Sequence, residues 1–122
     1  MKSTTKHTGQ LGETIALEYL LREGFSLLEK NWRHRKAEID LILQEGGTIV
    51  FIEVKTLQSD AHGSPESNIT RRKLDLMWDA AGAYMDESGH MGEIRFDFIS
   101  VILKSPDSYK VVHNRDAFWP GN

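Results

Sequence analysis

The chain has 122 residues, of which 39% are hydrophobic and 27% charged, and its formal net charge at pH 7 is −3. These values are typical of a soluble globular protein with a single core, so we interpret residues 1–122 as one domain. The acidic balance argues against tight, non-specific nucleic-acid binding over the whole surface, and the absence of cysteine excludes disulfides, thiolate zinc sites and cysteine nucleophiles.

No apolar run approaches the length of a membrane span, and the polar N-terminus does not resemble a signal peptide. We therefore expect a cytoplasmic protein without a membrane partner. Residues 1–7 show no periodicity and are predicted to form a flexible tail. A helix is predicted over residues 8–23, because apolar side chains recur at helical spacing and Gly24 follows as a stop signal. Its apolar stripe consists of Leu11, Ile15, Ala16, Tyr19 and Leu20.

A first strand is predicted over residues 25–30, and a basic run with one aromatic residue follows at 31–36. Charge runs of this kind are usually solvated loops. This run immediately precedes an acidic strand end, so it is also a candidate phosphate-contacting edge. The candidate nucleic-acid contacts within it are Arg33, Arg35 and Lys36.

Apolar, β-branched segments at 38–44 and 48–55 flank Gly46-Gly47, which predicts a β-hairpin with a two-residue primed turn. The turn sets the pairing along both strands. Alternation predicts one core face on the first strand, made by Ile39, Leu41 and Leu43, and continued by the second strand. The other face is also apolar away from the charged end, so the sheet is expected to be covered on both sides.

This register gathers charged side chains at the open end of the hairpin. Asp40 would lie opposite Glu53, and Glu38 opposite Lys55, all on one face. Opposed carboxylates repel, and removing a charge from water is costly unless it is paired or binds a cation. A divalent ion such as Mg²⁺, which takes oxygen ligands, would remove the repulsion. Lys55, about 7 Å along the strand from Glu53, could then hold an attacking water or steady a phosphate charge.

Residues 57–68 are polar and are predicted to form a loop that is a candidate flap over this site. A second helix is predicted over residues 68–86, capped by Asn68 or Thr70. Its buried stripe is predicted to consist of Leu74, Met77, Trp78, Ala81, Tyr84 and Met85. We interpret Met77 and Trp78 as core residues rather than as a platform for nucleotide stacking.

Three cations, Arg71, Arg72 and Lys73, fall in the first turn of this second helix, where positive charge opposes the helix dipole. A solvated face is the default interpretation for Arg71 and Arg72. An anionic ligand that holds the three cations is the alternative.

A strand is predicted at 94–103, parallel to the strand at 48–56 because a right-handed crossover joins them. An edge strand follows at 109–113, and residues 120–122 are predicted to be flexible. We interpret Asp97 as a structural, buried and hydrogen-bonded carboxylate. The fold class is α/β, with the order α-β-β-β-α-β-β and a mixed sheet that carries a helix on each face.

The spacing Asp40…Glu53-x-Lys55 resembles the PD-(D/E)XK nuclease superfamily, and motifs over nearly the whole chain resemble the YraN-type family of uncharacterised bacterial endonuclease-like proteins. The further matching stretches are Gly12-Glu13, Gly24-Phe25, Asn31-Trp32-Arg33, residues 38–42, residues 51–56, Gly63 with Pro65, Lys73 and Arg95-Phe96-Asp97. Ala37 stands where the family usually has glycine, and Leu57 where it often has a basic residue.

The resemblance implies a restriction-endonuclease-like core similar to that of Holliday-junction resolvases. It also implies a metal-dependent endonuclease that hydrolyses phosphodiester bonds in DNA, including branched DNA, and that works as a homodimer because a symmetric substrate needs two cuts. The implied catalytic residues are Asp40, Glu53 and Lys55.

The cofactor implied by the resemblance is Mg²⁺ or Mn²⁺. The implied metal ligands are Asp40, Glu53, the Val54 carbonyl and Glu13, with Glu38 supporting Lys55. Lys73 matches a family position and is expected to contact nucleic acid. A structural alternative for Glu13 is a favourable interaction with the N-terminal dipole of the first helix.

Two other functions stay open from the sequence. One is a nucleic-acid-binding module on a nuclease fold that hardly cuts, which the departures at Ala37 and Leu57 favour and the intact Asp40, Glu53 and Lys55 set opposes. The other is a protein-interaction domain in which the charged patch is only a solvated strand end. Binding of magnesium and of nucleic acid distinguishes the three.

Overall fold

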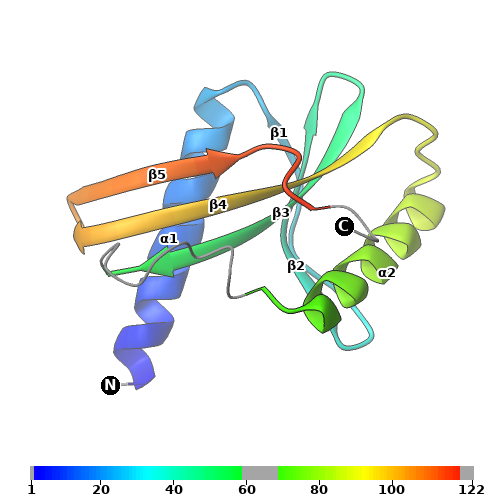
Figure 1. Cartoon of the computed structure of the whole chain (residues 1–122). Helices are drawn as coiled ribbons and strands as arrows, with labels where there is room; N and C mark the ends of the chain where they lie inside the picture. Colours follow the sequence, from blue (N-terminus) through cyan, green and yellow to red (C-terminus); the bar gives the residue numbers. More distant parts are fainter. Residues whose placement is uncertain (1, 59–68, 119–122) are drawn as a thin grey trace.

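The computed structural model describes residues 2–58 and 69–118, and the described elements follow the predicted order (Figure 1). They are α1 (Lys2–Arg22), β1 (Ser26–His34), β2 (Ala37–Glu45), β3 (Thr48–Leu57), α2 (Arg71–Ser88), β4 (Ile94–Ser105) and β5 (Ser108–Asn114). The strands form a five-stranded sheet in the order β1-β2-β3-β4-β5. Only β3 and β4 pair in parallel, as the crossover predicts. The predicted mixed α/β fold is therefore confirmed.

The turn between β2 and β3 sets the register that the sequence predicts. Gly46 adopts a φ of +60°, which glycine reaches without steric cost. Glu45 pairs with Thr48, and Ile42 pairs with Phe51 farther along the ladder. Two glycines between apolar segments were therefore sufficient to fix the pairing near the turn.

The helices cover opposite faces of the sheet, with α1 behind it and α2 on the other side in Figure 1. Under α1 the core contains Ile15, Leu20, Leu41, Val50, Ile52 and Ile99, whereas under α2 it contains Ile42, Phe51, Met77, Ala80, Ala81 and Phe96. The two-sided cover that the apolar strands predict is thus present. Neither of the described helices is long and apolar enough to cross a membrane.

Several predicted boundaries are wrong. Residues 2–7, predicted as a tail, continue α1. The basic run was expected to form a loop, but β1 extends through His34 and leaves residues 35–36 as the turn. Thr70 caps α2, since its Oγ1 accepts a hydrogen bond from the Lys73 N–H at 3.1 Å. Of the candidate flap predicted at 57–68, Leu57 instead ends β3, and residues 59–68 lie outside the described residues, as does the predicted flexible end at 120–122.

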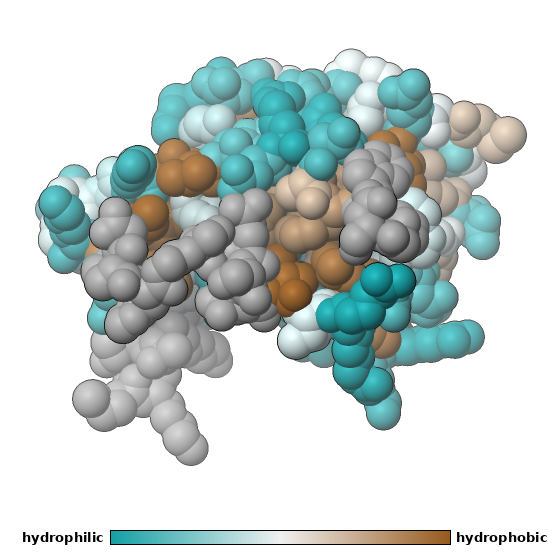
Figure 2. Space-filling view, in the orientation of Figure 1, coloured by the Kyte–Doolittle hydropathy of each residue, from teal (hydrophilic) through white to brown (hydrophobic). Residues whose placement is uncertain are grey.

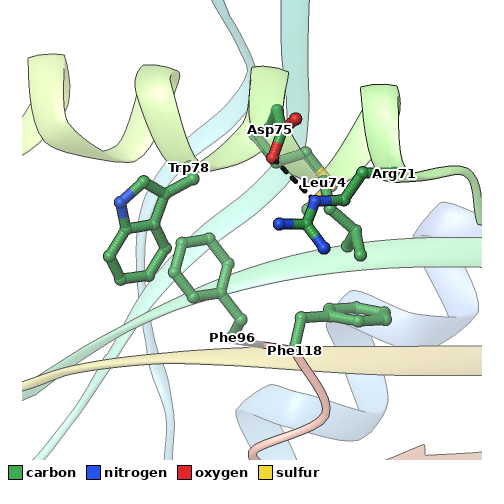
Figure 3. A pocket seen from close by; sticks show the side chains of 7 residues that line it. Arg71, Leu74, Asp75, Trp78, Phe96 and Phe118 are labelled. Atoms are coloured by element: carbon green, nitrogen blue, oxygen red, sulfur yellow. Dashed lines mark ion pairs between the residues drawn. The ribbon is translucent and has the colours of Figure 1, made fainter. Parts of the chain in front are cut away.

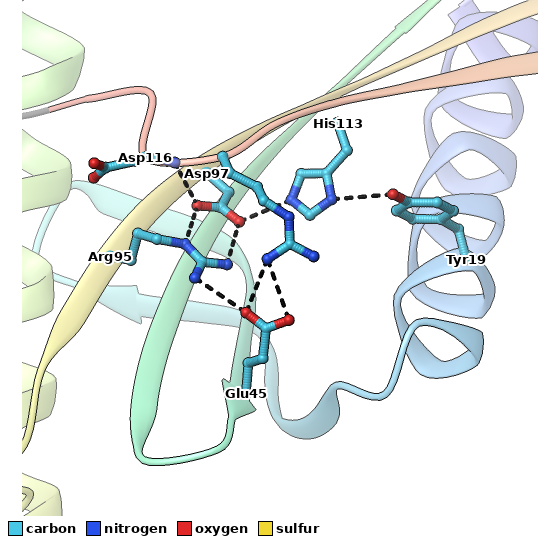
Figure 4. Close-up of polar contacts among 7 residues, drawn as sticks. Tyr19, Glu45, Arg95, Asp97, His113 and Asp116 are labelled. Carbon is cyan, nitrogen blue, oxygen red and sulfur yellow. Dashed lines mark hydrogen bonds and ion pairs between the residues drawn. The ribbon is translucent and has the colours of Figure 1, made fainter.

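A buried carboxylate on β4 connects this strand to β5, as Figure 4 shows. Asp97 is fully buried and accepts hydrogen bonds from the Arg95 guanidinium at 2.8 and 2.9 Å. It also lies 2.8 Å from His113 Nε2 on β5 and accepts the Asp116 N–H at 2.9 Å. Burial alone would raise the pKa of Asp97, but His113, Arg95 and the Asp116 N–H outweigh it and lower the pKa to about 2. The predicted structural role of Asp97 is confirmed.

Two further residues extend this network to α1 and to the β2–β3 turn. The Tyr19 hydroxyl on α1 lies 3.2 Å from His113 Nδ1. Glu45 forms ion pairs with Arg95 at 3.0 Å and with Arg115 at 2.9 Å. The network therefore holds the C-terminal strands against the rest of the fold.

The backbone of α1 passes very close to β3 at Gly12. A Cβ placed on Gly12 would overlap the Thr56 Oγ1, well inside van der Waals contact. Only glycine permits this approach, which also brings the next residue, Glu13, towards the end of the β2–β3 hairpin.

We expect Gly12→Ala to lower the free energy of unfolding by about 1–3 kcal/mol, because the added methyl group must displace Thr56 or the helix. Urea denaturation measures this change. Gly9→Ala is the matched control, since a Cβ at Gly9 on the same helix meets no atom within 4 Å. The control should raise the free energy of unfolding by about 0.5–1 kcal/mol. Equal effects of the two substitutions would contradict the close contact.

We expect Asp97→Asn to lower the free energy of unfolding by about 3–5 kcal/mol at pH 6, because it leaves Arg95 and His113 without their buried anion. A carboxylate with a lowered pKa stabilises the fold fully when the pH is above 3.8, the ordinary pKa of the group. This contribution is lost as the pH falls towards 2. The deficit of the variant should therefore shrink between pH 4 and pH 2 in denaturation experiments. Asp107→Asn, at an exposed turn, should show no such deficit.

Candidate active site

The ladder between β2 and β3 stops just before the acidic residues. Its last described pair is Leu41 with Ile52. Beyond that pair the Asp40 Oδ2 accepts a hydrogen bond from the Val54 N–H at 2.8 Å, so a side chain supplies the acceptor that the β2 backbone no longer provides. The predicted backbone pairing of Asp40 with Glu53 is therefore wrong, although the register nearer the turn is correct.

At Asp40 the regular alternation of β2 side chains between the α1 side and the α2 side of the sheet is interrupted. Ile39 packs in the core under α2, whereas Leu41 packs in the core under α1. The prediction that Ile39, Leu41 and Leu43 share one face is wrong for this reason. The neighbouring strand is irregular here as well, with a register shift between Leu27 and Glu29 and a φ of +49° at Asn31. Asp40 thus sits at a bend, between the two cores.

The bend brings the Asp40 and Glu53 carboxylates together, as the sequence predicts. Burial raises the pKa of Asp40 most, and the negative charge of Glu53 raises it further. The Val54 N–H stabilises the carboxylate and opposes this effect, but the pKa of Asp40 still rises to about 8. Without an added positive charge, Asp40 therefore holds a proton at neutral pH.

Glu53 has one paired oxygen and one unpaired oxygen. Its Oε2 forms an ion pair at 2.9 Å with the Nζ of Lys73, from the first turn of α2. Its Oε1 is buried and has no hydrogen-bond partner among the described residues. Burial would lower the pKa of Lys73, but the hydrogen bond and the charge of Glu53, together with Asp40 and Glu38, raise it above 10.5. Lys73 is therefore a charged partner of Glu53.

A third carboxylate, Glu13, approaches the pair from α1. The Asn31 Nδ2 donates a hydrogen bond to Glu13 Oε1 at 3.1 Å, and the Glu13 charge contributes to the raised pKa of Asp40. Because α1 begins at Lys2, Glu13 lies inside the helix and not in its first turn. The alternative role at the helix N-terminus is therefore wrong.

Lys55 and Glu38 do not form the predicted pair. Lys55 is exposed and lies opposite Ser100 of β4, and the structure gives it no ion pair within the described residues. Glu38 instead lies 3.7 Å from Arg33. Lys55 shares its strand face with Glu53, two residues away, but Lys73 is the lysine that contacts the carboxylate. The three adjacent cations at 71–73 were the sequence signal for this contact.

The predicted nucleic-acid contacts Arg33, Arg35 and Lys36 are exposed around the β1–β2 turn. Figure 1 shows this turn beside the start of α2, which carries Arg71, Arg72 and Lys73. Two basic segments that are far apart in the sequence therefore lie at the same end of the molecule, next to the carboxylates.

The donor set fits a hard divalent cation. Two adjacent carboxylates that disfavour each other's negative charge, and one Glu53 oxygen without a hydrogen-bond partner among the described residues, are the features expected at a site for a positive ion. No three acidic or histidine side chains of the described chain converge on one point. Mg²⁺ does not require this, because it is usually bound by one or two carboxylates together with water and substrate phosphate.

A profile of the uncharacterised protein family UPF0102 matches residues 12–101, most of the chain. The chain belongs to the UPF0102 family. This is the YraN-type family that the motifs resemble. The matched segment contains Glu13, Asp40, Glu53, Lys55 and Lys73, so the whole candidate site lies inside the UPF0102 region.

Individual UPF0102 relatives cover nearly the full chain. The UPF0102 protein of Flavobacterium psychrophilum is 40% identical over 111 residues, which are 91% of this chain and 92% of the relative. The Chlorobium chlorochromatii protein is 39% identical over 122 residues, covering 96% and 95% of the two chains. The Clostridium botulinum protein is 40% identical over 121 residues, covering 97% and 98%.

The raised pKa of Asp40 predicts a pH-dependent stability in the absence of divalent ions. The folded state holds a proton that the unfolded state releases near pH 4, so stability should fall as the pH rises through about 8. Asp40→Asn removes this loss. The free energy of unfolding of Asp40→Asn relative to that of the wild type, measured by urea denaturation in EDTA, should rise by at least about 1.4 kcal/mol between pH 5 and pH 9. This amount corresponds to a shift of one pKa unit. Asp107→Asn should give no such trend, and a flat difference for Asp40→Asn would contradict the raised pKa.

Proposed function

We propose that this UPF0102 protein is a metal-dependent endonuclease that hydrolyses phosphodiester bonds in DNA. The observation that carries the proposal is the pair of half-buried carboxylates Asp40 and Glu53, in which Glu53 raises the pKa of Asp40 and the Glu53 Oε1 has no hydrogen-bond partner among the described residues. A fold gains no stability from such an arrangement. It is the arrangement expected where a cation belongs.

In this function Asp40 and Glu53 hold Mg²⁺ or Mn²⁺, with the Val54 carbonyl as a further ligand and Glu13 as an outer one. The ion, when bound, supplies a more acidic water and neutralises charge on the phosphate. Lys55 lies exposed on the face of β3 that carries Glu53, and it orients the attacking water or stabilises the phosphate charge. Glu38, next to Arg33, contributes to the negative field that also acts on Lys73.

Arg33, Arg35 and Lys36 serve as phosphate contacts that position DNA beside the carboxylates. Because the chain is acidic as a whole, binding depends on this local basic rim and should weaken with added salt. We also propose a cytoplasmic location, because that is where a bacterial enzyme acting on DNA meets its substrate. We further propose branched DNA as a substrate and a two-fold homodimer as the form that makes two cuts.

The test is a calorimetric titration with Mg²⁺ and Mn²⁺ of the wild type, Asp40→Asn and Glu53→Gln, followed by incubation of the same samples with linear and branched DNA. The wild type should bind the ion, melt at a higher temperature in its presence, and cut DNA. Both variants should lose metal binding and lower the cleavage rate by about 100-fold or more, since the charge stabilisation at stake is several kcal/mol.

Glu93→Gln is the matched control, because it makes the same chemical change at an exposed residue just before β4. That variant should behave as the wild type. DNA binding without metal binding or cleavage would replace the nuclease by a nucleic-acid-binding module. The absence of both metal and DNA binding would favour a protein-interaction domain.

A further inference from the structure

A lysine from α2 places a positive charge directly at the candidate metal site. The Lys73 Nζ lies 2.9 Å from the Glu53 Oε2, and the side chain of Glu53 is only 12% exposed. The negative charges of Asp40 and Glu38 also act on this ammonium group. One of the two Glu53 oxygens is therefore already paired with a cation at the position where the proposed function requires a metal ion.

The Lys73 side chain can move although its backbone is fixed. The Thr70 Oγ1 accepts a hydrogen bond from the Lys73 N–H at 3.1 Å and so holds the start of α2. The side chain itself is 45% exposed, and its four-carbon stem is flexible. The ammonium group can therefore leave Glu53 for the solvent without a change in the backbone of α2.

A divalent ion and the Lys73 ammonium group compete for the same carboxylate. A protonated lysine has no lone pair and cannot serve as a metal ligand. Its charge repels a second cation close to Glu53, and Mg²⁺ also demands near-ideal octahedral geometry from its ligands. Metal binding in the free protein thus requires the ammonium group to leave Glu53, which weakens the apparent affinity for the metal.

The surroundings of α2 indicate which ligand attracts the ammonium group away from Glu53. Figure 2 shows hydrophilic residues projecting at the lower right of the view, where Figure 1 places the start of α2 and the basic β1–β2 turn. The start of α2 is also the positive end of the helix dipole, which favours anions. Arg71 in this turn pairs with Asp75 at 3.3 Å (Figure 3). A DNA phosphate held at this end of the molecule offers Lys73 another anion in exchange for Glu53.

We propose that Lys73 competes with the metal ion for Glu53 and moves to a phosphate when DNA binds, so that metal binding depends on DNA. The inference rests on the proposed nuclease function and adds the regulation of the same site. Coupling between two ligands is reciprocal, so DNA raises the affinity for Mg²⁺ by the same factor by which Mg²⁺ raises the affinity for DNA. The free protein therefore binds the metal weakly, and the substrate completes the site.

The first experiment is a calorimetric titration with Mg²⁺ in the absence of DNA. Lys73→Met, which keeps a long side chain and removes its charge, should bind Mg²⁺ about tenfold more tightly than the wild type, a typical size for such coupling. Lys73→Arg keeps the charge and should bind as weakly as the wild type.

Arg72→Met is the matched control, because it removes one charge from an exposed residue of the same turn and should change the affinity less. Binding by Lys73→Met that is no tighter than binding by the wild type would contradict the competition. Equal gains in Lys73→Met and Arg72→Met would contradict it as well, since they would show an effect of net charge alone.

The second experiment measures the affinity for fluorescein-labelled branched DNA with and without Mg²⁺. It uses a Lys55→Ala background, which keeps the metal ligands and lacks the residue assigned to the attacking water. Mg²⁺ should tighten DNA binding in this background. Adding Lys73→Met should lower the ratio of the two affinities about tenfold, since only direct contact between metal and phosphate then couples the ligands. An unchanged ratio would overturn the coupling through Lys73.

Acetylation of lysine side chains by acetic anhydride gives a third measurement, which needs no variant. Mass spectrometry compares the rate of acetylation at Lys73 with that at Lys110, an exposed lysine on the edge strand β5. Saturating Mg²⁺ without DNA should raise the rate at Lys73 severalfold, because the amine is then in solvent and no longer paired with Glu53. DNA added with the metal should lower this rate again, and the rate at Lys110 should not change. A rate at Lys73 that does not respond to bound Mg²⁺ would overturn the proposal.

The outcomes separate this inference from the proposed function. Metal-dependent cleavage by the wild type, with Mg²⁺ binding that ignores Lys73, would reject the competition and keep the nuclease. Tighter Mg²⁺ binding by Lys73→Met, with no cleavage of any DNA by the wild type, would keep the competition and reject the nuclease. No Mg²⁺ binding by any of these proteins, with or without DNA, would reject both.

Discussion

The Asp40 carboxylate bonds to β3 at the point where the backbones of β2 and β3 part. The ladder is regular from the glycine turn to Leu41 and Ile52. Beyond this pair the alternation along β2 is interrupted, because Leu41 packs in the core under α1 whereas Ile39, two residues away, packs in the core under α2. The Val54 N–H needs an acceptor at this position, and Asp40 supplies it. Because the same bond draws Asp40 out of solvent and next to Glu53, a structural need of the sheet creates the electrostatic conflict of the site.

Two effects reduce this conflict in the fold. The raised pKa of Asp40 favours its protonated form, and the Lys73 ammonium pairs with Glu53 at 2.9 Å. Under the proposed function, a divalent cation would take over both tasks. Asp40 would then lose its proton, and Lys73 would become available to a phosphate, which is the role that the family resemblance implies for it. The ion pair of Lys73 and its expected nucleic-acid contact are thus compatible as two states of one residue.

The sequence predicted those parts of the fold that depend on local chemistry. Gly46-Gly47 determined the turn, the apolar strands indicated a cover on both faces, and the connection through a helix indicated that β3 and β4 are parallel. The failures share a physical cause, because periodicity assumes a straight, regular strand. The register shift near Glu29 and the left-handed backbone at Asn31 are not visible as a pattern, so neither the face change at Asp40 nor the full length of β1 could be read from the residues.

The sequence predicted which residues form the candidate site more accurately than which of these residues contact one another. Spacing alone placed Asp40 and Glu53 together, but it paired Lys55 with Glu38, since no pattern shows that α2 begins next to β3. The misplaced Trp78 has a similar origin. An apolar residue at helical spacing is expected to be buried, yet burial depends on what covers it, and here Trp78 stays 37% exposed.

Under the proposed function, the carboxylates explain the chemistry of this small protein but not its choice of substrate. Two carboxylates and a cation act on a phosphodiester irrespective of the base attached to it, so they provide little discrimination among nucleic acids. An acidic chain with only a local basic rim cannot gain selectivity through broad electrostatic attraction either.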